Sequence, residues 1–376
     1  MKKLYRLDAW HKLLALRFKS LKWRHGVLIA LLILVTLTKM IPLWGFIYTT
    51  RIYPVIGTLL SPISGIFPFA VGDIFIALSI AWVILYPIYE MGWRKKRVFG
   101  RVAEYLLWVY AWFYIAWGLN YSQPNIYYRI GMKPVEVSKA KFKEFAYQYA
   151  DSLNALSNAS LSNARKGISP DSIVDDGLKN RVRDAVLKEY NKIGYREGIN
   201  KPFNQHPHAK TMVFTPISSM SGVTGSMGPF FCEFTLNGDI LAHDYPATYA
   251  HEFAHFLGVA NEGEANFYSY IVCTASADKQ VRFSGYYHIF FHVLNNVFDI
   301  LGEKEGERFL KHIRPEIIQR ARNDRRYWLS KRCKALDAAQ DFIFELYLRG
   351  NHVAEGRKSY SGVIGLILAW EEKIKK

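Results

Sequence analysis

The chain has 376 residues, of which 50% are hydrophobic and 15% aromatic, and its formal net charge is +17. This composition excludes a disordered or low-complexity protein, and three cysteines are too few for a small domain held together by disulfides. A mean hydropathy of -0.03 in a chain with 22% charged residues predicts a very apolar part beside a very polar one.

The apolar part consists of three runs near the start of the chain, at 27–46, 69–88 and 105–119. A membrane-spanning helix needs about 20 mostly apolar residues. The first two runs are long enough, and the third is long enough if Arg101 and Glu104 lie at the interface. One such run would fit a buried core helix, but three so close together predict three membrane spans.

Basic residues predict how these spans are oriented. They cluster in 2–24 and in 94–101, whereas Arg51 alone lies between the first two runs. Because basic loops stay in the cytoplasm, we expect the N-terminus inside and the chain after about Asn120 outside. Lys39, within the first run, is expected to extend toward the outer interface. This placement accounts for much of the positive charge without nucleic acid and makes the lipid bilayer the expected partner.

The chain is therefore expected to divide into a basic cytoplasmic N-terminus at 1–25, a transmembrane region at 26–120 and an extracytoplasmic domain at 121–376. The stretch 48–68 is apolar but contains three prolines, so we expect an interfacial or re-entrant segment there rather than a fourth span. Six aromatic residues fit a belt at the outer face of the membrane: Trp112, Tyr114, Trp117, Tyr121, Tyr127 and Tyr128.

From about Ser138 the composition becomes that of a globular domain. Helices are predicted at 138–157 and 175–193, and most of the chain after Pro246 is expected to be helical. Between them lie a strand candidate at 211–218, a Gly/Ser-rich loop at 219–228 and a second strand candidate at 229–238. The predicted fold class is an α-helical membrane region with three spans, followed by a mainly helical α+β domain.

A zinc-hydrolase motif lies in the stretch 245–258, which reads YPATYAHEFAHFLG. Pro246 is placed like the first residue of a helix and Gly258 like the residue after its end. Side chains four apart share a helix face, so His251 and His255 can reach one ion, and Glu252 can act on a water beside it. The alternative is a pair of surface histidines on an amphipathic helix.

A catalytic zinc needs three protein ligands and one open position. The stretch EGEAN at 262–266 begins another apolar run, and a turn at Gly258 can bring it back to the first helix. Glu262 and Asn266 are four apart and face the same way, so we favour Glu262 as the third ligand and Asn266 as a hydrogen-bond partner of a ligand histidine. Glu264, rotated by about 200°, is the rival ligand. Either glutamate could instead be a solvated residue that favours a helix N-terminus.

These motifs carry two resemblances. HExxH followed by E-x-x-A-[D/N] resembles the gluzincin class of zinc metallopeptidases, which implies a zincin-like domain with zinc on His251, His255 and Glu262. The short gap between the two motifs, and Asn266 where many members have Asp, depart from that class. The whole chain also resembles a family of uncharacterised bacterial membrane proteins, a domain of unknown function, which implies topology and motif but no activity. The resembling segments are 67–75, 117–121, 220–234, 251–270 and 355–368.

Other parts of a peptidase site are expected more loosely. An extended substrate would pair with an edge strand at 230–236, in which Glu233 either faces the cleft or is an edge charge that discourages aggregation. A donor for the oxyanion is also needed. The candidates, each of which is as readily a structural residue, are Tyr286, His288, His292, Arg357 and Tyr360.

The sequence thus predicts a membrane-anchored zinc metallopeptidase, with Zn²⁺ as cofactor, that cleaves envelope or extracellular protein substrates. Glu252 is the expected catalytic base. The alternative is a non-catalytic membrane scaffold with a structural zinc site, which would need four protein ligands. Cleavage inside the bilayer is disfavoured, because the HExxH helix and the following EGEAN are too polar to span lipid.

Overall fold

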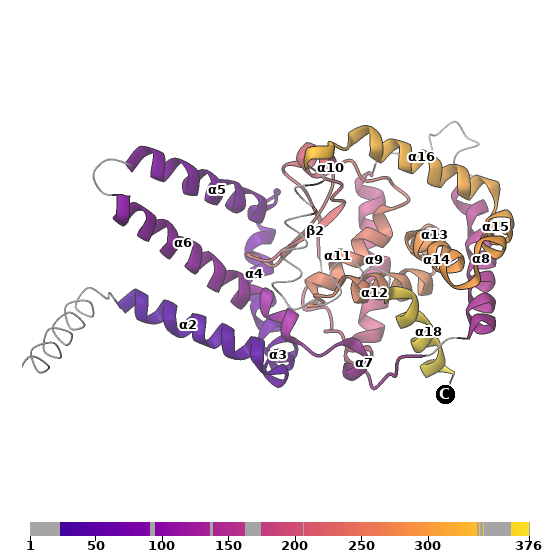
Figure 1. Ribbon diagram of the computed structural model, residues 1–376, viewed down its shortest axis with the longest axis horizontal. Coiled ribbons are helices and arrows are strands. Elements are labelled where there is room, and N and C mark those ends of the chain that lie inside the picture. Colours follow the sequence, from indigo (N-terminus) through magenta and orange to yellow (C-terminus); the bar gives the residue numbers. More distant parts are fainter. Residues whose placement is uncertain are drawn as a thin grey trace, which may run out of the picture.

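A computed structural model describes residues 23–90, 95–135, 138–161, 174–205, 207–336, 338, 341 and 362–375. The described chain is mostly helical, with one small sheet among these residues. Three long helices project side by side from one face of a larger helical domain (Figure 1). These helices fall within residues 23–116, and the expected division of the chain stays a prediction, since most of its basic N-terminal segment, before Trp23, lies outside the described residues.

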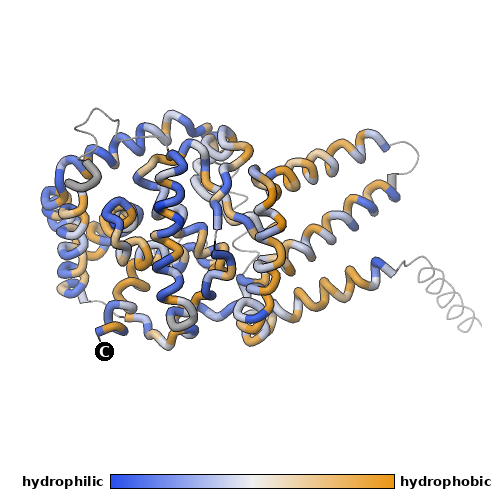
Figure 2. The backbone as a smooth tube through the Cα atoms, turned by 180° about the vertical axis from the view of Figure 1, so that it is seen from behind, coloured by the Kyte–Doolittle hydropathy of each residue, from blue (hydrophilic) through white to orange (hydrophobic). Residues whose placement is uncertain are grey.

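The projecting helices are α2 (Trp23–Met40), α5 (Val71–Glu90) and α6 (Lys95–Ala116), and α6 lies between the other two. Within the described chain, α2 and α5 are long and apolar enough to cross a membrane. The third predicted run falls in α6, whose basic start and Glu104 make it less apolar on average. Hydrophobic residues cover much of the surface of these helices (Figure 2).

Short helices connect α2 to α5: α3 (Pro42–Ile47), the π-helical η1 (Tyr48–Ile52) and α4 (Tyr53–Gly65). The stretch 48–68 is therefore largely helical despite its prolines, and its interfacial or re-entrant placement stays a prediction. Pro54 lies in the first turn of α4, where its missing N–H is tolerated, and Pro62 is accommodated inside the helix. The Tyr53 side chain is completely buried, so this connection packs into the domain.

After α6 the chain enters the domain through η2 (Gly118–Ser122) and α7 (Ile126–Arg129). The predicted helices at 138–157 and 175–193 are present as α8 (Lys139–Leu161) and α9 (Asp176–Ile193), followed by η4 (Gly194–Glu197). The centre of the domain is formed by α11 (Tyr245–Phe256), α12 (Glu262–Ala275) and α13 (Lys279–His288). The outer helices are α14 (Phe290–Asn296), η5 (Val297–Leu301), α15 (Glu303–His312), α16 (Pro315–Lys331) and α18 (Val363–Ile374).

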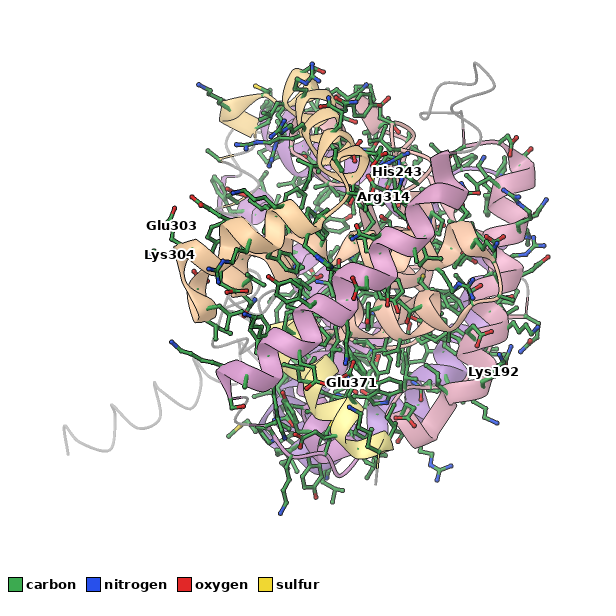
Figure 3. The ribbon with its side chains drawn as sticks, turned by 90° about the vertical axis from the view of Figure 1, so that its right-hand side faces the viewer. Lys192, His243, Glu303, Lys304, Arg314 and Glu371 are labelled. Carbon is green, nitrogen blue, oxygen red and sulfur yellow. The ribbon has the colours of Figure 1, made fainter. Side chains whose placement is uncertain are left out.

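Viewed from the end opposite the projecting helices, charged side chains such as Lys192 and Lys304 lie at the periphery of the domain (Figure 3). His243 lies inside, among the helices, and is almost completely buried. The distribution is that of a domain surrounded by water, in contrast to the apolar surface of α2 and α5.

The sheet has the order β1-β3-β2, from β1 (Lys210–Thr211), β2 (Gly225–Gly228) and β3 (Glu233–Leu236). β1 runs parallel and β2 antiparallel to β3. The predicted strand at 211–218 is wrong, since the chain turns into the short helix α10 (Thr215–Met220), with Pro216 in its first turn. The predicted loop at 219–228 contains β2, and the predicted edge strand at 230–236 becomes the central strand β3. The edge beside the histidine helix is therefore β2.

Candidate metal centre and its cleft

The histidine-bearing helix α11 is buried along its whole length. It begins at Tyr245 with Pro246 in its first turn and ends at Phe256, followed by Gly258 at a φ of +97°, as the sequence predicted. His251 and His255 are only 9% and 6% exposed, which rules out a pair of surface histidines. Because only a few residues separate α11 from α12, the start of α12 returns directly to the two imidazoles.

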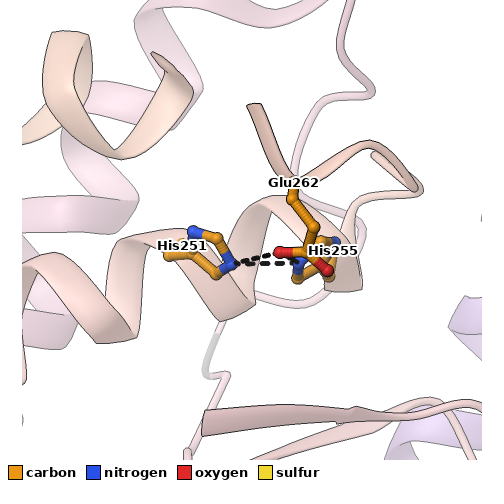
Figure 4. A group of neighbouring side chains, drawn as sticks. All are labelled: His251, His255 and Glu262. Carbon is orange, nitrogen blue, oxygen red and sulfur yellow. Dashed lines mark hydrogen bonds and ion pairs between the residues drawn. The ribbon is translucent and has the colours of Figure 1, made fainter. Parts of the chain in front are cut away.

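The structure brings His251, His255 and Glu262 together (Figure 4). The Nε2 atoms of the two histidines are 3.1 Å apart. The Oε2 atom of Glu262 lies 3.2 Å from Nε2 of His251 and 3.4 Å from Nε2 of His255. All three ligand-type atoms lie within 4.8 Å of one another, so this group could hold a metal ion.

The other ring nitrogens are held by carbonyl oxygens. Nδ1 of His251 lies 2.8 Å from Oδ1 of Asn266, the contact predicted for Asn266, and Nδ1 of His255 lies 2.6 Å from the backbone oxygen of Val259. Carbonyl oxygens only accept hydrogen bonds, so each Nδ1 carries a proton and each Nε2 faces the group, where its lone pair is available whenever the imidazole is neutral. This is how a protein orients imidazoles for a metal.

The two histidines stabilise the negative charge of Glu262. Burial alone would raise the pKa of its carboxyl, but the charges and hydrogen bonds of His255 and His251 hold that pKa well below its ordinary value. Glu262 is therefore an anion beside two imidazoles. A cation bound among these three side chains would meet a matched negative charge.

Glu264, the rival third ligand, is directed elsewhere. Its Oε2 lies 2.6 Å from Nη2 of Arg129, and its Oε1 accepts a hydrogen bond of 2.9 Å from the backbone N–H of Ile126. Both charged side chains are buried. Glu264 thus anchors α7 to the start of α12, and its carboxylate does not join the two histidines.

Glu252 lies in the same cleft as the metal-ligand candidates and has an unpartnered oxygen. Its Oε2 atom is buried and has no hydrogen-bond partner among the described residues. Burial raises the pKa of this carboxyl, although His251 and His255 oppose the shift. Strand β2 crosses directly above it, and a Cβ atom at Gly225 would lie 2.4 Å from Oε1 of Glu252. Only glycine fits at that position without displacing the carboxylate.

These residues line a cleft with a volume of about 950 Å³. One part of the lining is 221–227, which includes most of β2. Another part contains Phe113 from α6, Trp117 directly after that helix and Tyr121 from η2. Arg332, just after α16, also lines the cleft and lies beside Gly222. Sequence reasoning missed Arg332, because it lies about 80 residues from the motif and carries no local signal.

Two of the five predicted oxyanion donors lie in the cleft. His288 and His292 line the cleft, whereas Tyr286 packs against Tyr149 and Tyr270 away from it. Nε2 of His288 lies 2.9 Å from Oδ1 of Asn266, and burial, helped by the charges of His251 and His292, lowers the pKa of His288 to about 3. The remaining two candidates, Arg357 and Tyr360, lie outside the described residues.

The C-terminal end of α11 is held by side chains from other parts of the chain. Each of the last carbonyl oxygens, from residue 255 to residue 258, accepts a side-chain hydrogen bond. The donors are Trp117 Nε1 (3.0 Å), Tyr53 Oη (2.7 Å), Asn200 Nδ2 (2.8 Å) and Gln123 Nε2 (2.7 Å), in that order. Three of them flank the projecting helices in sequence, and Trp117 is buried there instead of standing in an interfacial belt. The histidine helix is thus joined rigidly to the base of those helices.

Glu233, considered as a residue facing the cleft or an edge charge, is neither. Its Oε1 accepts a hydrogen bond of 2.5 Å from the backbone N–H of Gly72, and its Oε2 lies 2.7 Å from Nζ of Lys210. The side chain is buried on the central strand. It therefore connects the start of α5 to the sheet.

A second group that could hold a metal ion consists of His243, Asp244 and Asp324. Both ring nitrogens of His243 already have a hydrogen-bond partner. Nη1 of Arg320 lies 3.0 Å from Nδ1 of His243 and can only donate to it, so Nε2 carries the proton toward Asp324, 2.8 Å away. Since Arg320 holds one ring nitrogen of His243 and Asp324 the other, the group is a hydrogen-bonded network next to the start of α11, with no free imidazole nitrogen for a metal.

Fold and site together define a mostly helical protein with candidate membrane helices and a buried His–His–Glu group that could hold a metal ion. The chain belongs to the family DUF3810, described as a protein of unknown function, which matches residues 48–368. That range includes α5, α6 and the whole candidate metal centre. No match was found among curated proteins or among solved structures.

Proposed function

We propose that this protein is a membrane-anchored zinc metallopeptidase whose cleft lies outside the cytoplasm. Its substrates are envelope or extracellular proteins. The observation that carries the proposal is the meeting of three ligand-type atoms with Glu252, whose Oε2 atom has no hydrogen-bond partner among the described residues, in one cleft.

The spacing of the ligand-type atoms supports zinc. Histidine and carboxylate ligands bind tetrahedral Zn²⁺ at ~2.0–2.1 Å, so two neighbouring ligand atoms lie about 3.3 Å apart. The separations among His251, His255 and Glu262 are 3.1, 3.2 and 3.4 Å. The two Nε2 lone pairs face each other, an arrangement that only a proton or a metal ion between them makes favourable. Zinc, when bound, acts as a Lewis acid that polarises a carbonyl and acidifies water.

The proton transfers are the task of Glu252. Its carboxylate takes a proton from water as the new C–O bond forms at the peptide carbonyl, and passes this proton to the amide nitrogen as the C–N bond breaks. The products are a carboxylate and an amine. Arg332 and His292 line the cleft and can donate hydrogen bonds to the oxygen on which negative charge develops.

The geometry also supports an extended peptide as substrate. Among the described residues β2 pairs with β3 on one side only, and most of its residues line the cleft beside Glu252. A substrate strand can pair with the remaining edge through backbone hydrogen bonds, which serve any sequence. This assigns to β2 the role that sequence analysis gave to residues 230–236.

The membrane part of the proposal includes α6 as a third span beside α2 and α5. The three helices project together (Figure 1) and contain many hydrophobic residues along their length (Figure 2). Many of their large apolar side chains are exposed. Lys39 lies near the end of α2 that meets the domain, with Nζ 3.1 Å from the hydroxyl of Tyr114, as expected for a charge close to the outer interface. With basic loops inside, the domain lies outside the cytoplasm.

The decisive experiment measures zinc content and cleavage of a random peptide library by the full-length protein in detergent. We expect about one zinc per chain, loss of zinc in His251→Ala and His255→Ala, and normal zinc in Glu252→Gln. Cleavage should fall by roughly 10²- to 10⁴-fold in Glu252→Gln. Glu307→Gln, an exposed glutamate on α15, is the matched control and should behave as wild type. Equal cleavage by wild type and Glu252→Gln would refute the peptidase, and full zinc in the double histidine variant would refute the metal site.

A further inference from the structure

One wall of the cleft is made by the projecting helices themselves. Phe113 lies in the last turn of α6 and Trp117 directly follows the helix, yet both line the same cleft as Glu252 and the two histidines. At 1.5 Å of rise per residue, Phe113 is only about 5 Å from the end of α6. If α6 spans the bilayer, the reacting groups therefore lie close to the membrane surface.

The loop between β2 and β3 holds the cleft in this position. The Phe230 ring lies 4.9 Å from the ring of Phe75 in α5 and 6.1 Å from that of Phe113 in α6. Nε1 of Trp112 donates a 3.0 Å hydrogen bond to the backbone oxygen of Phe230, and Phe230 also lines the cleft. Together with the side chains that hold the end of α11, these contacts prevent the cleft from moving away from the helix ends.

The rim of the cleft continues the apolar surface of the projecting helices. Just before the cleft-lining segment 221–227, the α10 region exposes four apolar side chains, those of Val213, Phe214, Ile217 and Met220. The backbone N–H of Val213 donates a 2.8 Å hydrogen bond to Asp73 at the start of α5, and Phe67 and Phe69, just before α5, are exposed as well. An exposed apolar rim beside membrane helices fits the interface of the same bilayer.

We infer that the substrate is a polypeptide with its own membrane anchor, cut in the extended segment that adjoins this anchor. The inference rests on the proposed peptidase function and narrows its substrate class. A cleft fixed at the ends of the spans, with aromatic residues on the side of α6 and an extended edge at β2, receives a chain that leaves the bilayer beside it. A folded soluble protein would have to insert a loop between the domain and the lipid surface.

The test uses full-length protein in phosphatidylethanolamine/phosphatidylglycerol vesicles. The probe is a single transmembrane helix followed by an unstructured stalk of about 40 residues with randomised sequence, and the same stalk without the helix is the comparison. Cleavage sites are mapped by mass spectrometry, with Glu252→Gln as the background. We expect cuts within about 15 residues of the helix and a rate about tenfold or more above that of the free stalk, because anchoring raises the local concentration.

Different outcomes would contradict the inferred substrate class and the proposed peptidase function. Cuts that depend on Glu252 but spread evenly along the stalk, or that occur equally fast in the free stalk, would overturn the inference and leave the peptidase standing. The absence of any Glu252-dependent cut in both probes would overturn the proposed function and the inference with it.

A variant pair tests the rim separately. Ile217 is 56% exposed on α10, and Phe291 is 51% exposed on α14, away from the projecting helices. Ile217→Ser should lower cleavage of the anchored stalk several-fold and leave the free stalk unchanged, since neither residue lines the cleft. Phe291→Ser should change neither rate. If the two variants behave alike on the anchored stalk, the α10 region does not contact the bilayer.

Discussion

The histidine helix α11 and the projecting helix α5 differ in how the burial of their residues relates to polarity. In α11 every residue from Tyr245 to Phe256 is buried, although the helix carries two histidines and a glutamate. α5 is far more apolar, yet Gly72 alone is buried among its described residues. Burial in this chain thus does not follow polarity: the two histidines of α11 are hydrogen-bonded within the site and Glu252 is buried with one oxygen unpartnered, whereas α5 exposes a large apolar surface of the kind that marks an interaction site.

The largest effect is expected where a buried charge loses its partner. Glu264→Ala leaves Arg129 buried without its carboxylate and should lower the free energy of unfolding by about 3–5 kcal/mol. Glu262→Ala should instead remove zinc with a smaller change in stability. Chemical unfolding and zinc analysis of the purified variants distinguish the two roles. Loss of zinc in a folded Glu264→Ala protein, with zinc retained in Glu262→Ala, would reverse the assignment of the third ligand.

The surroundings of α5 can be tested with a matched pair of exposed leucines. Leu78 in α5 is 65% exposed and Leu329 in α16 is 57% exposed. An arginine at the centre of a membrane helix costs about 2.5–3.5 kcal/mol, whereas an arginine on a water-exposed helix costs almost nothing. Leu78→Arg should therefore reduce membrane insertion in a carbonate-extraction assay, and Leu329→Arg should not. Equal insertion of both variants would mean that α5 does not face lipid.

The fit of β2 over Glu252 predicts a loss of activity without a loss of metal. In Gly225→Ala the new Cβ atom displaces the Glu252 carboxylate, and a shift of this kind lowers the rate by about tenfold to a hundredfold. Peptide cleavage and zinc content are measured together. Gly365→Ala, whose new Cβ would lie 3.7 Å from its nearest neighbour, is the control. Wild-type rates in Gly225→Ala would show that β2 does not position Glu252.

A smaller effect is expected at the junction of α6 and α11. Trp117→Phe keeps an aromatic ring at this position but removes the hydrogen bond to the backbone oxygen of His255, which should lower the free energy of unfolding by about 1 kcal/mol. Trp44→Phe, at a partly exposed tryptophan, should lower it less. Thermal unfolding in detergent compares the two. The same midpoint in both variants would mean that the base of α6 does not support the histidine helix.

Local sequence determined most of the candidate metal centre. Pro246 and Gly258 mark the limits of α11, and the spacing of His251 and His255 places both side chains on one face. The prediction that Glu262 and Asn266 face the histidines also agrees with the structure, in which both contact His251. It succeeded because these residues and the turn before them belong to two helices that follow each other directly in the chain. Such features depend on helical periodicity and turn chemistry, which short segments carry by themselves.

Tertiary structure alone decided the partners from distant segments. The sequence could not tell that Glu264 pairs with Arg129, that Trp117 holds the histidine helix, or that β2 rather than 230–236 forms the free edge. Arg332 reaches the cleft in the same way, without a local signal. Each of these contacts joins residues far apart in the chain, and a side chain that offers a charge or an N–H does not specify which of several buried acceptors it will meet. That choice is made only when the helices pack, because burial favours those arrangements in which most polar groups find a partner.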